Sequence, residues 1–288
     1  MRAFVATADE GHVGRASGRL HVTQPTLSRQ IAALEHAVGV PLFDRGRRRL
    51  ALTPAGEVFL AGARDLVRRA DDLAEEARRA HRGELGVLRV GFVQSATFEA
   101  LPKLLATFRA AWPDVTVEVT AMTTIRQLDA LSDGRLDAGL LRTTIGVSAS
   151  DLVTRTLSAD ALFAALPAGH RLAAAPTVRL ADLAGEPFVL YKRDSGPVVH
   201  DTIVGHCLAA GFSPRITQEA VDVQTIVALV AANLGVSLLI APTPHTDEAA
   251  VVFRPLAEEL PPWEMALAWS RRNRAPVLAR LLETVSPD

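Results

Sequence analysis

The chain has 288 residues, 49% of them hydrophobic, so it is long enough for two or three compact domains and too apolar for global disorder. A net charge of −1 argues against a nucleic-acid partner only if the charge is uniform, and residues 1–58 hold eight arginines and five acidic residues, a net charge of +3. Because a Debye length of about 10 Å screens the distant acidic part, a phosphate would meet this local positive charge. Cys207 is the only cysteine, which excludes an intramolecular disulfide and a cysteine-based zinc finger.

Residues 12–54 predict two short helices, a tight turn and an arginine-tipped β-ribbon. Apolar residues at helical spacing predict the first helix, and His21-Val22 predicts the turn. Thr23 can cap the second helix because its side-chain oxygen can accept a hydrogen bond from a first-turn N–H, and Pro25 is tolerated there. The second helix carries one apolar stripe at i, i+4, i+7 and i+11, formed by Leu27, Ile31, Leu34 and Val38.

The opposite face of the second helix is polar, which is typical of a helix that reads DNA. An amide, hydroxyls and a guanidinium in the first turn of a surface helix can hydrogen-bond to base edges in a major groove and to phosphates. The ribbon that follows adds arginines that can reach the DNA backbone. We therefore expect the chain to bind double-stranded DNA through Thr23, Gln24, Pro25, Thr26, Ser28, Arg29, Arg45, Arg47, Arg48 and Arg49.

The segments RASGRLHVTQPTLSRQIAALE and VGVPLFDRGRRRLALTPAGE resemble the helix-turn-helix and wing of LysR-type transcriptional regulators. The resemblance covers dozens of residues with matching spacing. It implies a winged helix-turn-helix domain over residues 1–58, with Leu42-Phe43 packed inward. In that family a glutamine, a proline, a serine and an arginine of the second helix face DNA, which here would be Gln24, Pro25, Ser28 and Arg29.

A long helix is expected from Thr53 to Arg82, because no strand pattern interrupts this stretch. Its apolar positions alternate spacings of four and three, and alanine in such a seam allows a second helix to approach closely. The seam covers barely three heptads, so periodicity leaves open whether the helix packs on its own domain or pairs with another chain. The resemblance favours pairing, because LysR-type proteins dimerise through this helix and assemble into tetramers. We assign residues 59–86 to the linker and hinge. The seam consists of Phe59, Ala63, Leu66, Ala70, Leu73 and Ala77.

From residue 87 onward, short apolar strands alternate with helices, which predicts an α/β domain with parallel sheets covered on both faces. A long middle segment follows the first strands, and the chain returns to them near residue 260. This order predicts two lobes joined by two chain connections. This is the periplasmic-binding-protein-like architecture of LysR-type effector domains. We expect an effector-binding domain over 87–288, with lobe I at 87–160 and 260–288 and lobe II at 161–259. The expected strands are 87–93, 115–121, 137–142, 162–167, 187–192, 215–220, 235–241 and 263–270, and the expected helices are 96–111, 124–132, 198–210, 223–233 and 275–285.

Polar residues follow the predicted strands at their carboxyl ends, where open parallel sheets bind ligands. Helix starts there offer N–H and hydroxyl donors, and a strand-end arginine offers a bidentate cation, which together suit a carboxylate. Two simpler interpretations stay open: Ser95 and Thr124 can be helix caps, and Arg142 can form a surface ion pair. The expected effector-binding residues are Ser95, Ala96, Thr124, Arg142, Pro197 and Val199.

The effector domain is most similar to the branch of the family that responds to muconate, benzoate and related acids. That similarity implies that the serine, threonine and arginine hold the effector carboxylate and that Pro197 lines the pocket. Near Val199, where that branch would have an aromatic residue, this chain has valine.

Patterns for catalysis and for metal binding are absent from the sequence. It contains no G-x-S-x-G elbow, no P-loop and no dinucleotide fingerprint. His200 and His206 are wrongly spaced to share a metal, and we expect both at the surface. Cys207 lies in an amphipathic stretch and is expected to be a small buried residue, with a redox sensor as the alternative. We predict no enzyme, no metal and no cofactor.

The predicted function is ligand-responsive transcriptional regulation from an interrupted palindromic operator. The expected effector is a small organic acid, aromatic or dicarboxylic, whose binding alters access for RNA polymerase. The protein is expected to be a homodimer through the linker helix, assembled into a homotetramer. With no signal peptide and no apolar run that could span a bilayer, it is expected in the cytoplasm and away from membranes. The alternatives are an enzyme or a transport solute-binding protein that uses the two-lobed fold.

Overall fold

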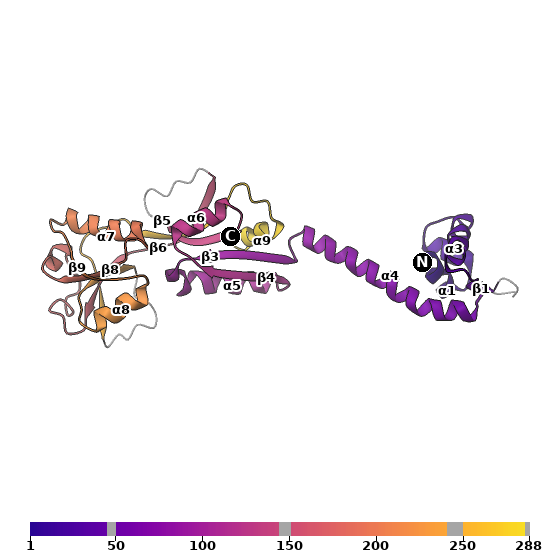
Figure 1. The fold of residues 1–288 in the computed structure, drawn as a ribbon, viewed down its shortest axis with the longest axis horizontal. Helices are drawn as coiled ribbons and strands as arrows, with labels where there is room; N and C mark the ends of the chain where they lie inside the picture. Colours follow the sequence, from indigo (N-terminus) through magenta and orange to yellow (C-terminus); the bar gives the residue numbers. More distant parts are fainter. Residues whose placement is uncertain (45–49, 144–150, 241–249, 286–288) are drawn as a thin grey trace. The chain divides into compact units, whose positions relative to one another are not determined.

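The computed structural model describes residues 1–44, 50–143, 151–240 and 250–285 (Figure 1). The chain divides into two compact units, Met1–Arg79 and Ala80–Asp288.

The amino-terminal unit is a three-helix core with a short ribbon and a long helix. Its elements are α1 (Arg2–Glu10), α2 (Val13–Arg19), α3 (Gln24–Val38), β1 (Phe43–Asp44), β2 (Ala51–Leu52) and α4 (Pro54–His81). The sequence did not predict α1, which supplies the centre of the core. The ring centroid of Phe4 lies 5.2 Å from that of Phe43 and 5.4 Å from that of Phe59, so one side chain of α1 joins the ribbon to α4.

The predicted cap of α3 is confirmed. Thr23 precedes the helix in extended conformation, and its Oγ1 accepts a hydrogen bond from the Thr26 N–H at 3.4 Å. Leu27 and Ile31 are buried as predicted, but Val38 is exposed. The buried stripe is therefore shorter than predicted, because α3 ends at Val38 and the left-handed Gly39 turns the chain away.

The start of α4 is held against the base of the ribbon. The Thr53 hydroxyl accepts a hydrogen bond from the Gly56 N–H at 2.9 Å and donates one to the Pro41 carbonyl at 2.8 Å. A Cβ at Gly56 would lie 2.1 Å from the Leu42 carbonyl oxygen, so only glycine permits this approach. Further along α4, Leu66 and Leu73 of the predicted seam are exposed.

Lobe I of the carboxyl-terminal unit is a five-stranded sheet in the order β4-β3-β5-β12-β6. Its strands are β3 (Gly86–Phe92), β4 (Val115–Ala121), β5 (Ala138–Thr143), β6 (Leu152–Asp160) and β12 (Trp263–Ser270). Its helices are the 3-10 turn η1 (Gln94–Thr97) and α5 (Ala100–Ala111), α6 (Thr124–Ser132) and α9 (Pro276–Thr284). Leu140 faces a core shared with α5 and α9, whereas Leu141 faces a core shared with α6, so helices cover both faces as predicted.

Strand direction in lobe I agrees with the prediction for only part of the sheet. β3 runs parallel to β4 and β5, but β12 is antiparallel to both β5 and β6. β6 was not predicted. It leaves toward lobe II and β12 returns from there, so the two strands run in opposite directions.

Lobe II combines antiparallel and parallel pairs. Its elements are β7 (Leu162–Pro167), η2 (Leu180–Leu183), β8 (Pro187–Tyr191), α7 (Pro197–Ala209), β9 (Arg215–Ala220), α8 (Val223–Ala231), β10 (Ser237–Ile240) and β11 (Val251–Pro255). β7 lies antiparallel between β10 and β11, and β8 is parallel to β9. Phe188 and Leu190 pack toward α7 and Val189 toward α8, which lie on either side of β8 (Figure 1).

Two side chains of α7 test predictions about burial. Cys207 is fully buried in the lobe II core, as predicted, and burial raises the pKa of its thiol to about 11. His200 is buried, contrary to the predicted surface position, because α7 turns it inward, where its Nδ1 lies 3.1 Å from the Asp201 carboxylate.

Candidate functional site

The first turn of α3 presents the predicted DNA-facing side chains to solvent. Gln24, Pro25, Ser28 and Arg29 are exposed, and Thr26 is half-buried. Thr23 is exposed, but its hydroxyl is committed to capping α3 and lies 2.9 Å from the Thr26 hydroxyl. Among the described residues, Arg29 makes one hydrogen bond, a long one of 3.4 Å from its Nε to the Pro25 carbonyl, so its terminal nitrogens are available to a partner. The predicted wing residues Arg45, Arg47, Arg48 and Arg49 lie outside the described residues.

The base of the ribbon is tied to α3 by Glu35. Its Oε1 accepts hydrogen bonds from the backbone N–H of Leu42 at 2.8 Å and of Phe43 at 3.1 Å. Since Leu42 and Phe43 are buried, few other acceptors can reach these donors. Glu35 was not predicted from the sequence, because a glutamate on a helix usually belongs to a solvated face. Its carboxylate therefore holds the base of the ribbon against α3.

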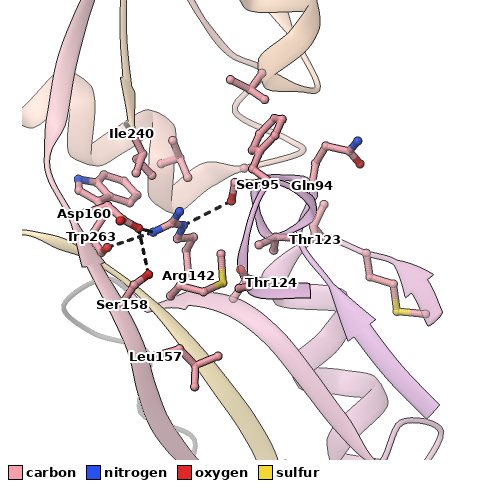
Figure 2. Close-up of a pocket in the computed structure, with 18 of the residues that line it drawn as sticks. Gln94, Ser95, Thr123, Thr124, Arg142, Leu157, Ser158, Asp160, Ile240 and Trp263 are labelled. Carbon is pink, nitrogen blue, oxygen red and sulfur yellow. Dashed lines mark hydrogen bonds and ion pairs between the residues drawn. The ribbon is translucent and has the colours of Figure 1, made fainter. Parts of the chain in front are cut away.

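The strand ends of the two lobes line a cavity of about 1240 Å³ (Figure 2). Ser95 follows β3, Thr124 begins α6 after β4, and Arg142 lies near the end of β5. Pro197 and Val199, at the start of α7, line the same cavity from lobe II. The fold thus brings together five of the six predicted effector-binding residues.

Ala96 does not line this cavity. Its side chain is fully buried in the lobe I core. Its backbone N–H donates to the Val93 carbonyl at 2.8 Å, so this donor is already occupied.

Arg142 forms an ion pair inside the cavity and not at the outer surface. Its side chain is 12% exposed, and its Nη1 contacts the Asp160 carboxylate at the end of β6. Nη1 also donates to the Trp263 carbonyl at 3.1 Å, and Nε donates to the Ser95 hydroxyl at 3.3 Å. Figure 2 shows these contacts converging on the guanidinium. The sequence analysis missed Asp160 because it did not predict β6.

Ser95 and Thr124 are not used as helix caps. Ser95 accepts from Arg142, and no side chain caps η1. Thr123 occupies the cap position of α6 without a side-chain cap hydrogen bond, and Thr124 is the first helical residue. First-turn N–H groups of α6 therefore face the cavity without a capping side chain. Buried Gln127 holds this helix start in place, because its Nε2 donates to the carbonyls of Met122 and Leu140 at 3.1 and 3.2 Å.

Lobe II adds the carboxylate of Asp222 and the phenol of Tyr191 to the cavity lining. Asp222 caps α8 by accepting from the Thr225 N–H at 2.8 Å and from its hydroxyl at 2.9 Å. Burial raises the pKa of Tyr191 above its usual range, so its hydroxyl stays protonated at neutral pH. Behind the cavity, Arg193 binds Asp201 through two hydrogen bonds, of 2.7 and 2.8 Å. The hydrogen bonds from Arg193 and His200 lower the pKa of Asp201 to about 2.

Two other kinds of site are absent from the described residues. In the part of the chain that the structure describes, no three histidine, cysteine, aspartate or glutamate side chains gather as a metal site would require. Among the same described residues, no helix combines the length and the apolar character needed to cross a membrane.

Comparison with known proteins gives matches along almost the whole chain. Residues 1–57 match the family described as bacterial regulatory helix-turn-helix protein, lysR family, and residues 81–287 match the LysR substrate binding domain. The chain is 41% identical over 281 residues to the uncharacterized HTH-type transcriptional regulator YnfL of Escherichia coli K12, covering 97% of this chain and 94% of that protein. It is 33% identical over 282 residues to the HTH-type transcriptional regulator AlsR of Bacillus subtilis 168, with coverages of 98% and 93%.

Solved structures agree with the sequence matches. The crystal structure of CbnR, a LysR family transcriptional regulator, superposes with a TM-score of 0.83 at 29% identity, over 99% of this chain and 98% of that one. Full-length CbnR in complex with its target DNA superposes with a TM-score of 0.81 at 28% identity, over 99% and 96% of the two chains. These relatives are transcriptional regulators and not enzymes, in agreement with the prediction from the sequence. The chain belongs to the LysR family of DNA-binding transcriptional regulators, with an amino-terminal helix-turn-helix and a carboxyl-terminal effector-binding domain.

Proposed function

We propose that the protein binds an interrupted palindromic operator as a dimer and changes transcription when a small organic acid enters the cavity between its lobes. The observation that carries this proposal is the placement of Arg142, Ser95 and the uncapped start of α6 around one cavity. A carboxylate needs a fixed cation and N–H or O–H donors, and this cavity offers both. The aromatic or dicarboxylic character expected of the acid comes from the resemblance. We keep the domain limits of 1–58, 59–86 and 87–288 as part of the proposal.

The DNA half of the proposal rests on α3 and α4. The exposed amide, hydroxyl and guanidinium at the start of α3 can reach base edges. The wing arginines, which lie outside the described residues, are proposed from the sequence to contact phosphates. On α4, the exposed side chains of Leu66 and Leu73 would be covered by the same helix of a second chain. A two-fold dimer then presents two α3 helices to half-sites about 34 Å apart. Two such dimers form the proposed tetramer.

The ligand half rests on where Arg142 makes its contacts. Asp160 is the last residue of β6, just before the chain enters lobe II, and Trp263 is the first residue of β12, just after it returns. Because Arg142 contacts both residues, a ligand bound to its guanidinium can affect both chain connections between the lobes. A ligand that binds one lobe arrangement more tightly shifts the population toward it, and this shift would change access for RNA polymerase.

The DNA assignment is tested by Arg29→Ala in the full-length protein. Operators are first selected from a pool of duplexes by the unchanged protein, and affinity is then compared by mobility shift at one salt concentration. Losing an arginine contact to a base should weaken binding by about 1–3 kcal/mol, or about 5- to 150-fold. Arg68→Ala, an exposed arginine of α4, is the matched control and should bind nearly normally. Equal affinity of Arg29→Ala and the unchanged protein would remove Arg29 from the interface.

The ligand assignment is tested by a thermal-shift screen of small aromatic and aliphatic carboxylates. A ligand selective for the folded state raises the melting temperature, and the shift grows with the logarithm of its concentration above the dissociation constant. Arg142→Ala should abolish the shift while operator binding without ligand persists. Arg109→Ala, an exposed residue of α5 that does not line the cavity, should keep the shift. An unchanged dose response of Arg142→Ala would contradict the assignment.

A further inference from the structure

In the described part of the chain, each residue of the Arg142–Asp160 ion pair has one polar side-chain atom without a hydrogen bond. The Asp160 Oδ2 accepts from the Arg142 Nη1 and from the Ser158 hydroxyl, the latter at 3.3 Å. Within the described ranges of the chain, no hydrogen bond is found for the Asp160 Oδ1 or for the Arg142 Nη2. Both side chains line the cavity, and their exposed fractions are 26% and 12% (Figure 2). The ion pair therefore keeps one acceptor atom and one donor atom that a ligand can use.

Asp160 changes what Arg142 can attract. The pair is already neutral, so a plain carboxylate bound to Arg142 would lie next to the negative charge of Asp160 with no ligand donor between them. Like charges in a partly dehydrated site repel more strongly than they do in water. Five other charged residues line the cavity, two carboxylates and three cations, and in the described part of the chain none of them forms a hydrogen bond or ion pair with Arg142 or Asp160: Glu99, Asp222, Lys103, Arg126 and Arg155. A ligand fits this arrangement best when a hydrogen-bond donor accompanies its carboxylate.

We propose that the cavity binds an acid that carries a hydrogen-bond donor on the atom next to its carboxylate. The carboxylate contacts the Arg142 Nη2 and the Ser95 hydroxyl, and the donor contacts the Asp160 Oδ1. An ammonium is favoured over a hydroxyl, because a zwitterion leaves the net charge at the Arg142–Asp160 pair unchanged and its charged hydrogen bond is stronger. The preferred class is thus a 2-amino acid, followed by a 2-hydroxy acid. This inference rests on the proposed function and narrows its ligand.

The rest of the cavity suits an apolar side chain on that acid. Ile125 at the start of α6, Val198 at the start of α7 and Val221 after β9 are exposed aliphatic residues that line the cavity. Leu157 and Val199 line it as well. Burying such surfaces against a branched or aromatic group removes apolar area from water on both molecules.

The experiment uses two matched sets of acids and isothermal titration calorimetry on the full-length protein. One set is 3-phenylpropanoate, 3-phenyllactate and L-phenylalanine, and the other is 4-methylpentanoate, 2-hydroxy-4-methylpentanoate and L-leucine. In at least one set, the dissociation constant should fall from the plain acid to the hydroxy acid to the amino acid. The total change should be about tenfold or more, as a charged hydrogen bond in a partly buried site gives.

Asp160→Asn tests whether Asp160 accepts the hydrogen bond from the donor on the ligand. The amide keeps an oxygen for Arg142 but removes the negative charge, so the amino acid should bind about tenfold more weakly and the plain acid more tightly. Asp129→Asn, on the exposed face of α6 and outside the cavity, should keep the original order. Unchanged operator binding and melting temperature without ligand would show that Asp160→Asn is folded.

The outcomes separate the two claims. If plain acids bind the unchanged protein as tightly as amino acids, and binding still depends on Arg142, the inference is overturned and the proposed function stands. An unchanged order of affinities in Asp160→Asn would also overturn the inference. If no acid binds in either set or in the wider screen, both claims fail.

Discussion

Replacing Glu35 with alanine should loosen the junction between α3 and the ribbon. The Glu35 Oε1 is the acceptor for the N–H groups of Leu42 and Phe43, at 2.8 and 3.1 Å, and these residues are 0% and 5% exposed. A buried donor left without an acceptor costs about 1–3 kcal/mol. Because Glu35 is itself half-buried, water can replace part of what is lost. We therefore expect the free energy of unfolding of the amino-terminal unit to fall by about 2–4 kcal/mol.

The three tryptophans provide an internal control for this measurement. Trp112, Trp263 and Trp269 all lie in the unit Ala80–Asp288, so tryptophan fluorescence reports that unit alone, whereas far-ultraviolet circular dichroism reports the helices of both units. In urea, Glu35→Ala should lower the midpoint of the dichroism transition of the amino-terminal unit by about 1–2 M, given a typical slope of about 1–3 kcal/mol per molar. The fluorescence transition should stay in place.

Two variants complete the design. Glu35→Gln keeps a carbonyl oxygen for both donors and should lose only about 1 kcal/mol. Glu76→Ala, an exposed position on α4, should lie within about 0.5 kcal/mol of the unchanged protein. A dichroism transition unmoved by Glu35→Ala, or a Gln variant as unstable as the Ala variant, would refute the reasoning.

Two further predictions concern α7. Because burial raises the pKa of Cys207 to about 11, a thiol-specific reagent at pH 8 should label the native chain slowly and the unfolded chain at once. Fast labelling of the native chain would contradict the packing of α7. For Asp201, the pKa is lowered from 3.8 to about 2, so its stabilising contribution is present above pH about 4 and is lost as the pH falls toward 2. The difference in melting temperature between Asp201→Asn and the unchanged protein should be constant near neutral pH and should shrink on acidification. A difference that grows as the pH falls would show that the ion pair with Arg193 is not its source.

Local signals in the sequence were sufficient for most helices and for the position of the DNA-facing turn. Thr23 and Pro25 mark the start of α3 through their own backbone and side-chain chemistry, so the prediction of this helix needed no knowledge of the rest of the fold. The ends of β3, β4 and β5 were also predictable, because parallel strands with intervening helices bring their carboxyl ends to one edge. Ser95, Thr124 and Arg142 follow from this rule.

Other features were decided only by contacts between distant segments. Phe4 belongs to a helix that the sequence analysis did not predict, and it joins the ribbon to α4. Glu35 gains its role only when the ribbon folds back onto α3.

By itself, the sequence determined the family, the order of the domains and which polar groups stand at strand and helix ends, because these depend on periodicity and on neighbours along the chain. The tertiary structure alone decided that Asp160 meets Arg142. The two residues lie on different strands, with β12 between them, and β12 joins the sheet only after the chain has returned from lobe II. No local pattern encodes a charge pair made across a strand that arrives a hundred residues later.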